Sequence, residues 1–367
     1  MSEQLRVVIA GGGTGGHLYP GIAVARELQR RVPGAEISFA GTAKGIEARV
    51  VPREGFRLDL IRSGGLKGKS LVDRTRGAAL LPLSLVDAWR IVSVRQPDLV
   101  IGVGGYSSGP VVLTASLRGV PTMLLEQNAV PGLTNRLLAP FVKAAAVTFD
   151  STQTFFGSKA FVSGNPVRPE FFATAGLIQE SAIDDQTSGV RVLVFGGSQG
   201  AHAINMAMVE AAAGLAQHPS LHITHQTGER DVEMVRAGYR TAGIQADVEP
   251  FFFDMGRQLG QAQVVVSRAG ATTLAEITAA GKAAILVPLP TATDDHQRKN
   301  AEALASAGAA DLLLQSELDG GVLAQRILAL ARDRPRRIAM ASAARNLARP
   351  DAARVIGDRA LELARAR

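Results

Sequence analysis

Two segments of the sequence place an apolar strand, a glycine-rich turn and a helix in direct succession. The first is VVIAGGGTGGHLYPGIAVARELQRR at residues 7–31, and the second is VLVFGGSQGAH at residues 192–202. Glycines in such a turn let backbone N–H groups approach an anion at the start of the helix. The repeated pattern constrains the chain to an α/β architecture and predicts two similar Rossmann-like domains.

Further apolar runs alternate with amphipathic helices in both halves of the chain. Strands are predicted within LRVVIA, AEISFAG, DLVIGVGG, PTMLLEQ and AAAVTF, and then within VRVLVFGG, LHITHQTG, ADVEPFF, AQVVVSR and KAAILVPLP. Such alternation is typical of parallel, doubly wound sheets, and a length of 367 residues suits two domains. The boundary is predicted at GNPVRPE, which gives domains at residues 1–164 and 165–344.

The composition excludes several classes of protein. Cysteine is absent, which rules out disulfides and thiolate metal sites. The formal net charge of +7 indicates an anionic partner, such as nucleic acid, acidic lipid or a phosphorylated substrate. The N-terminal residues lack the pattern of a signal peptide, and the longest apolar run, GAALLPLSLVDAW, is too short to cross a bilayer. We therefore expect a cytoplasmic chain.

The first glycine turn matches a dinucleotide-binding fingerprint only in part. Gly11, Gly13 and Gly16 have the G-x-G-x-x-G spacing, but the second strand ends in ISFAGT, without the acidic residue that holds a ribose. This disfavours NAD or FAD. A turn without any ligand is the other alternative, although such a turn has no need of His17. Glycine clusters at 102–110 and 196–200 also follow strands, so together the three clusters favour a highly phosphorylated ligand.

A further helix-opening turn, after Ser267, is followed by an acidic residue suited to a ribose. In SRAGATTLAEITAAGKAAILVPLPTATDDHQRKNAEAL, residues 267–304, a strand ends at Ser267 and a glycine turn begins the helix that contains Glu276. A carboxylate there accepts both hydroxyls of a ribose, while the helix N-terminus meets a diphosphate. A solvated helix residue remains the alternative reading of Glu276.

Several blocks of the sequence together resemble one enzyme family. GGGTGGHLYPGIAVA, GGYSSGP, EQNAVPGLTNRLLA, GNPVR, GGSQGA and AGATTLAEI…DDHQRKNA occur in order over nearly the whole chain. They resemble the MurG family of bacterial N-acetylglucosaminyltransferases of peptidoglycan synthesis. The resemblance implies a GT-B fold, with two Rossmann-like domains facing a cleft, the nucleotide sugar mainly on the second, and a final helix, about residues 345–367, packing back onto the first.

The resemblance also implies the reaction and its partners. GlcNAc would pass from UDP-GlcNAc to the C4 hydroxyl of the lipid-linked muramyl pentapeptide, in a single displacement that inverts the anomeric carbon. No cofactor is implied, and without a D-x-D motif or clustered histidines no bound metal is expected. Further expected partners are an anionic membrane surface and other cell-wall synthesis proteins, but no nucleic acid, because interleaved aromatic platforms are missing. The expected location is the cytoplasmic face of the inner membrane.

Site residues follow from the matched blocks. Donor contacts are expected from both halves of the chain: Thr14, Gly15, Gly16, Asn128, Arg168, Ser198, Phe252 (through its backbone), Ala271, Thr272, Thr273, Leu274, Ala275, Glu276 and Gln297. Tyr106 and Ser107 are expected on the acceptor side.

Two residues are candidates for the general base. His17 is preferred because an imidazole titrates near neutrality, and Glu126, at the end of the LLEQN strand, is the alternative. If Glu126 is the base, His17 would position the acceptor or a phosphate.

A basic and apolar stretch indicates a second surface. GLKGKSLVDRTRGAALLPLSLVDAWR combines basic residues with an apolar helix. From the residues alone, a core helix after a basic loop is the alternative. The family resemblance implies a membrane-facing patch that includes Leu81, Leu85, Trp89 and Lys143.

Rival functions share parts of these patterns. Another UDP-sugar transferase or a UDP-GlcNAc epimerase would have the same fold and the same acidic ribose contact. A nicotinamide-dependent oxidoreductase would require the acidic residue that is missing after ISFAGT. A nucleotide-binding module without catalysis would leave the polar residues of the N-terminal half without a role.

Overall fold

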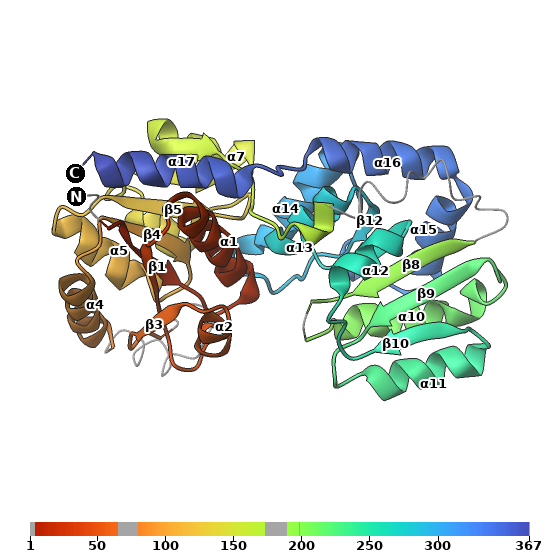
Figure 1. The fold of residues 1–367 in the computed structure, drawn as a ribbon. Helices are drawn as coiled ribbons and strands as arrows, with labels where there is room; N and C mark the ends of the chain where they lie inside the picture. The colour runs from red at the N-terminus through yellow and green to blue at the C-terminus, as the bar shows by residue number, and fades with distance from the viewer. Residues whose placement is uncertain (1–3, 65–79, 173–188, 198, 367) are drawn as a thin grey trace. The chain divides into compact units, whose positions relative to one another are not determined.

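The structure is a computed structural model that describes residues 4–64, 80–172, 189–197 and 199–366. The chain forms two compact units (Figure 1). Unit 1 consists of Met1–Val167 together with Arg349–Arg367, and unit 2 consists of Arg168–Ala348. Each unit is a parallel sheet covered by helices, as the alternation of strands and helices predicts.

In the described part of unit 1, seven parallel strands form a sheet in the order β3-β2-β1-β4-β5-β6-β7. The strands are β1 (Arg6–Gly11), β2 (Glu36–Gly41), β3 (Arg57–Leu60), β4 (Leu99–Gly104), β5 (Thr122–Glu126), β6 (Ala144–Val147) and β7 (Ala160–Val162). The helices are α1 (Gly15–Arg31), α2 (Glu47–Arg53), α4 (Leu81–Arg95), α5 (Ser108–Leu117), α6 (Leu133–Leu138), α7 (Asp150–Phe156) and α17 (Ala352–Arg365), with a 3₁₀ turn at Gly157–Lys159.

The alternation of side chains along β1 divides the core of unit 1 into two layers. Val7 and Ile9 pack into a cluster with residues of α1 and α17. Val8 and Ala10 point to the opposite face, where they join residues of α4 and α5. Because successive side chains of a strand point to opposite faces, a strand that is apolar throughout, such as β1, must be covered on both sides.

In unit 2, the described residues form a six-stranded parallel sheet in the order β10-β9-β8-β11-β12-β13. The strands are β8 (Val190–Phe195), β9 (Leu221–Gln226), β10 (Ala246–Glu249), β11 (Val264–Ser267), β12 (Ala283–Leu286) and β13 (Asp311–Leu312). The helices are α10 (His202–Leu215), α11 (Val232–Ala242), α12 (Met255–Gln261), α13 (Ala271–Ala280), α14 (His296–Ser306), α15 (Gly320–Arg332) and α16 (Arg334–Asn346), with 3₁₀ turns at Thr293–Asp295 and Gln315–Glu317.

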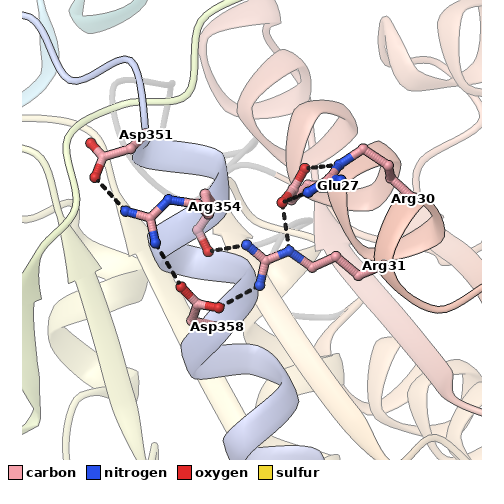
Figure 2. Close-up of polar contacts among 6 residues, drawn as sticks. All are labelled: Glu27, Arg30, Arg31, Asp351, Arg354 and Asp358. Atoms are coloured by element: carbon pink, nitrogen blue, oxygen red, sulfur yellow. Dashed lines mark hydrogen bonds and ion pairs between the residues drawn. The ribbon is translucent and has the colours of Figure 1, made fainter.

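Helix α17 returns to unit 1 and packs alongside α1 (Figure 1). Ile356 and Ala360 are buried in the same cluster as Leu18 and Ile22 of α1. A chain of ion pairs joins the two helices (Figure 2): Arg31 contacts Glu27 on its own helix and Asp358 on α17, and also donates to the carbonyl of Arg354. The apolar contacts and the ion pairs together fix α17 to unit 1.

Candidate active site

The glycine turn after β1 interlocks with the turn after the neighbouring strand β4. Gly11, Gly12 and Gly13 all have positive φ angles, of 140°, 146° and 82°. A β-carbon on Gly11 would overlap the carbonyl oxygen of Gly104, and the N–H of Gly12 donates to the same oxygen at 3.3 Å. Only glycine adopts these angles without strain and allows this approach, which is why both turns are rich in glycine.

His17 lies in the first turn of α1, directly after this glycine turn. Thr14 precedes the helix in an extended conformation, and its Oγ1 lies 3.3 Å from Nδ1 of His17. The imidazole also packs on Gly104, since a β-carbon there would lie 2.9 Å from Cδ2 and 3.0 Å from Nε2 of His17. The half-buried ring is therefore fixed at Nδ1 by Thr14 and along its edge by a glycine.

Glu47, which the sequence analysis does not identify, supports the same turn. Its carboxylate is buried and accepts hydrogen bonds from the backbone N–H groups of Gly13 and Thr42, each at 2.8 Å, and from Thr42 Oγ1 at 2.9 Å. Burial alone would raise the pKa of Glu47, but these donors hold it below the ordinary value. An ionised carboxylate thus fixes the backbone just before Thr14.

Glu126 is buried at the end of β5, where its carboxylate accepts four hydrogen bonds. Asn128 donates to Oε1 through its backbone N–H at 3.0 Å and its Nδ2 at 3.4 Å. Gly132 N–H and Asn135 Nδ2 donate to Oε2 at 2.9 and 2.8 Å. Burial raises the pKa of Glu126, and the four donors oppose that effect. Glu126 therefore organises the EQNAVPG loop, including Asn128.

The two residues expected on the acceptor side differ in exposure. Tyr106 is 42% exposed, whereas Ser107 is buried at the residue that precedes α5. Both directly follow the Gly104–Gly105 turn, on which the imidazole of His17 packs. Of the pair, Tyr106 has the side chain that is accessible to a ligand.

In unit 2, Glu276 lies on α13 beside an arginine and a second carboxylate. Arg168 Nη2 is 3.9 Å from Glu276 Oε1, and Arg168 Nη1 is 3.0 Å from Glu170 Oε1. The side chain of Glu276 is only 16% exposed. Burial raises the pKa of Glu276 to about 7, with Glu170 raising it further and Arg168 opposing the rise. The predicted residues Arg168 and Glu276 are thus brought together within this unit.

The N-terminus of α13 and Gln297 form a second part of the predicted donor site. Helix α13 begins at Ala271, with Gly270 extended before it, and the N–H groups of a first turn have no carbonyl partner inside the helix. Gln297 Oε1 accepts the N–H groups of Leu289 at 3.0 Å and Ala269 at 3.3 Å. This carbonyl joins the turns after β11 and β12, and Nε2 is the donor group of the same amide.

Along the first turns of α13, burial follows the helical repeat. Ala271 and Leu274 are buried in the fold of unit 2, while Thr272, Thr273, Ala275 and Glu276 are partly exposed. The partly exposed side of these turns therefore carries the two threonines and the carboxylate. Leu274 contributes packing, and its contact with a donor would be made by its backbone.

Phe252 is placed by a buried glutamine that no sequence pattern identifies. Gln226, at the end of β9, accepts the N–H of Phe252 at 2.8 Å and donates Nε2 to the carbonyl of Gly197 at 3.0 Å. The glycine turn after β8 is thereby connected to the PFFF segment. Ser198 lies outside the described residues. Because Gln226 occupies the N–H of Phe252, a ligand that contacts the backbone of this residue would do so through its carbonyl.

The residues expected at a membrane are exposed on α4. Leu81, Leu85 and Trp89 follow one another at intervals of four residues and are 44%, 42% and 58% exposed. Residues at this spacing share one helix face. The guanidinium of Arg118 lies 4.5 Å from the centre of the Trp89 ring, and Lys143 is exposed after α6. The basic residues at 67–76 lie outside the described residues.

Two absences hold for the residues that the structure describes. Within them, no group of three or more histidine, aspartate or glutamate residues has the arrangement of a metal site. No helix among those described is long and apolar enough to cross a membrane.

Family models and individual relatives match nearly the whole chain. The glycosyltransferase family 28 N-terminal domain matches residues 7–147, and the glycosyltransferase family 28 C-terminal domain matches residues 191–356. The UDP-N-acetylglucosamine–N-acetylmuramyl-(pentapeptide) pyrophosphoryl-undecaprenol N-acetylglucosamine transferase of Anaeromyxobacter dehalogenans (strain 2CP-C) is 48% identical, over 99% of this chain and 94% of its own length. The protein of the same name from Myxococcus xanthus is 46% identical, over 98% of this chain and 93% of its own length.

A solved structure agrees with these sequence matches. The crystal structure of Acinetobacter baumannii MurG is similar with a TM-score of 0.80 and 33% identity, over 98% of this chain and 99% of that one. Such identity over full length separates this chain from nicotinamide oxidoreductases that share only the Rossmann-like element. The chain therefore belongs to glycosyltransferase family 28, within its MurG family, and has the GT-B fold of these glycosyltransferases.

Proposed function

We propose that the protein transfers GlcNAc from UDP-GlcNAc to the C4 hydroxyl of the undecaprenyl-pyrophosphoryl muramyl pentapeptide, with His17 as the general base. The names of its full-length relatives support the substrates. The observation that carries the base assignment is the setting of His17, whose imidazole is fixed by Thr14 and Gly104 at the end of a parallel sheet. Ligands of open α/β sheets bind at the carboxyl ends of strands, where His17 lies.

The chemical step is a single displacement at the anomeric carbon. Nε2 of His17 takes the proton of the acceptor C4 hydroxyl, and the oxygen forms a bond to the anomeric carbon. The bond from that carbon to the diphosphate oxygen breaks as UDP leaves, so an α-linked donor gives a β-linked product. Negative charge that develops on the diphosphate is stabilised by Arg168 and by the N-terminus of α13.

The donor is held chiefly by unit 2. Ionised Glu276 accepts the two ribose hydroxyls, the carbonyl of Phe252 accepts from the base, and Nε2 of Gln297 donates to the sugar. On unit 1, Thr14, Gly15, Gly16 and Asn128 are the proposed donor contacts, while Tyr106 serves the acceptor. These assignments are supported by the burial of Glu276 beside Arg168 and by the hydrogen bonds that fix Phe252 and Gln297.

The surroundings of Glu126 favour His17 over this carboxylate as the base. Both oxygens of Glu126 accept hydrogen bonds from its own loop, and the residue is only 2% exposed. A proton taken by Glu126 would break at least one of these bonds. Histidine is the side chain that most often serves as a general base.

Formation of the lipid-linked disaccharide from radiolabelled UDP-GlcNAc and the lipid-linked muramyl acceptor tests the proposal. His17→Ala is expected to lower kcat by about 100-fold or more, as removal of a general base does, with UDP affinity nearly unchanged. Wild-type turnover in His17→Ala would exclude His17 as the base, and release of free GlcNAc without transfer would contradict the proposed acceptor.

We further propose that the exposed face of α4 docks on an anionic membrane surface. Leu81, Leu85 and Trp89 supply apolar area, and Arg118 beside the indole ring, with Lys143, supplies positive charge. Leucine and tryptophan with basic neighbours are typical of helices that bind the bilayer interface. Such a surface would bring the active site to an acceptor whose polyprenyl chain lies in the bilayer, at its cytoplasmic face.

Cosedimentation with vesicles tests this surface. The protein is expected to bind vesicles with anionic lipid more strongly than neutral ones, and the double variant Leu85→Glu with Trp89→Glu is expected to lose this binding. Ile338→Glu is the matched control, because Ile338 is 41% exposed on α16 of unit 2. Equal binding to both kinds of vesicle, or an unaffected double variant, would contradict the membrane role of α4.

A further inference from the structure

The side chain of Glu47 fills a space that three glycines leave around it. A β-carbon on Gly12 would lie 2.7 Å from Cδ of Glu47, one on Gly41 would lie 2.5 Å from its Cγ, and one on Gly45 would overlap its carboxylate. These glycines belong to the turn after β1, to the end of β2 and to the turn before α2. Glycines in three separate chain segments therefore leave the space that the buried carboxylate of Glu47 occupies.

The hydrogen bonds of Glu47 connect that space to the turn before His17. Oε2 accepts from the N–H of Gly13, and Oε1 accepts from the N–H and the hydroxyl of Thr42. Gly13 has a φ of 82°, and a β-carbon on it would meet no atom within 4 Å. The space at the β-carbon position of Gly13 is therefore open, and the hydrogen bond that its N–H donates to Glu47 restrains its peptide. Thr14, the next residue, carries the hydroxyl beside Nδ1 of His17.

We propose that Glu47 is a positioning residue for the transfer step: by fixing the peptide of Gly13, its carboxylate sets the Thr14–His17 pair in the orientation that proton abstraction needs. The inference rests on the proposed role of His17. The position of Glu47, on α2 behind the glycine turn, places it out of the chemistry itself, so that it acts only through the turn.

An amide cannot replace this carboxylate. The Gly13 N–H, the Thr42 N–H and the Thr42 hydroxyl are all donors, and they are divided between its two oxygens; the backbone N–H of Glu47 itself is a further donor. A glutamine has one oxygen and one NH₂ group, so either orientation sets a donor against the N–H of Gly13 or against Thr42. The substitution Glu47→Gln preserves the volume of the side chain but breaks one of the two attachments.

The test compares Glu47→Gln, His17→Ala and the double variant in the lipid-linked disaccharide assay. Glu47→Gln is expected to lower kcat by about 10- to 100-fold, the loss typical of a misplaced catalytic group, while the affinity for UDP changes by less than about threefold, because unit 2 chiefly holds the nucleotide. The double variant is expected to have the kcat of His17→Ala alone, since a positioning residue has no effect once the group it positions is absent.

A matched control uses a second carboxylate of the same sheet. Asp98 Oδ2 accepts the backbone N–H of Arg6 at 2.8 Å, at the opposite end of β1 from the glycine turn. Asp98→Asn is therefore the same kind of change without a connection to His17, and it is expected to keep kcat. If Glu47→Gln does not fold, Thr42→Val removes one donor to the same carboxylate and is expected to lower kcat in the same direction by about 2- to 5-fold.

Each result decides between the assignments. A folded Glu47→Gln with wild-type kcat, or a Thr42→Val variant with wild-type kcat where Glu47→Gln does not fold, overturns the role of Glu47 while the base assignment stands. Additive losses in the double variant overturn action through His17. Wild-type turnover of His17→Ala overturns the proposed base and, with it, the positioning role.

Discussion

The imidazole of His17 rests on Gly104, so closely that a β-carbon at residue 104 would lie 3.0 Å from Nε2. Gly104 has a φ of 96°, and its carbonyl accepts the N–H of Gly12 at 3.3 Å. One glycine at the end of β4 thus supports both the proposed base and the turn before it. The chemistry proposed for His17 therefore depends on a residue without a side chain.

Replacement of Gly104 by alanine is expected to displace the imidazole and to strain the backbone. We expect kcat to fall by about 10- to 100-fold, because a shift of about 1 Å in a catalytic group costs this much. Steady-state kinetics with the lipid-linked acceptor measures the loss.

Gly119→Ala is the control for backbone strain. Gly119 also has a positive φ, of 75°, but a β-carbon there would meet no atom within 4 Å. The control is expected to lose stability by about 1 kcal/mol, the cost of a left-handed alanine, and to keep its kcat. Equal losses of kcat in both variants would show that strain alone, without the imidazole contact, explains the effect.

The raised pKa of Glu276 predicts a pH dependence of donor binding. The carboxyl has a pKa of about 7, chiefly because of burial, and only the ionised form accepts both ribose hydroxyls. Affinity for UDP-GlcNAc is therefore expected to rise about tenfold between pH 6 and pH 8, as the proton leaves. Calorimetry measures this, and Glu276→Gln should bind weakly with no such rise.

Glu170 offers a way to move that pH dependence without touching the ribose contact. The negative charge of Glu170 raises the pKa of Glu276, and Glu170 also holds Arg168 at 3.0 Å. Glu170→Gln removes this repulsion and also removes the ion pair between Glu170 and Arg168. The pKa of Glu276 is therefore expected to fall, and the rise in affinity is expected at lower pH. A rise that stays at the wild-type pH would contradict the electrostatic coupling among these three residues.

The ion pair between Arg31 of α1 and Asp358 of α17 predicts a measurable contribution to the stability of unit 1. Arg31 is 16% exposed and contacts Glu27 and Asp358. Arg31→Met is expected to lower the free energy of unfolding by about 1–2 kcal/mol, more than an exposed pair contributes, because the charges are partly buried. Urea unfolding followed by the fluorescence of Trp89, the only tryptophan of the chain, reports on unit 1.

Arg359→Met is the control for this substitution. Arg359 contacts only Glu362 on its own helix among the ion pairs of the described residues, and both side chains are largely exposed. Its replacement is expected to change stability by at most about 0.5 kcal/mol. Equal effects of the two substitutions would contradict the stabilising role of the ion pairs of Arg31.

The sequence predicts most strands of both sheets, and most clearly β1 and β8, which are largely apolar and end in glycine turns. It does not predict β3, β7 and β13, which lie at or near the edges of the sheets and contain four residues or fewer. RLDL at β3 is half polar because an edge strand packs on fewer neighbours. Short segments of this kind become strands through pairing, which local composition does not record.

Site residues also divide into those that local sequence patterns identify and those that depend on contacts between distant segments. Glu276 and His17 stand beside glycine turns, so their setting is visible in a few consecutive residues. Glu47 acts through Gly12 and Gly13, which are distant in sequence, and in isolation it resembles any acidic residue in the first turn of a short helix. The available signal was the pair of glycines, Gly41 and Gly45, that gives a bulky carboxylate room to turn inward.

The return of α17 makes unit 1 discontinuous along the chain, whereas unit 2 is one continuous segment. During synthesis on the ribosome, the layer beside α1 stays incomplete until the whole of unit 2 has been translated. Ile356 and Ala360 then cover Leu18 and Ile22. Unit 1, which contains His17, is therefore completed only after unit 2, which contains Glu276, has been synthesised. A chain that ends prematurely leaves the apolar face of α1 exposed to chaperones and proteases.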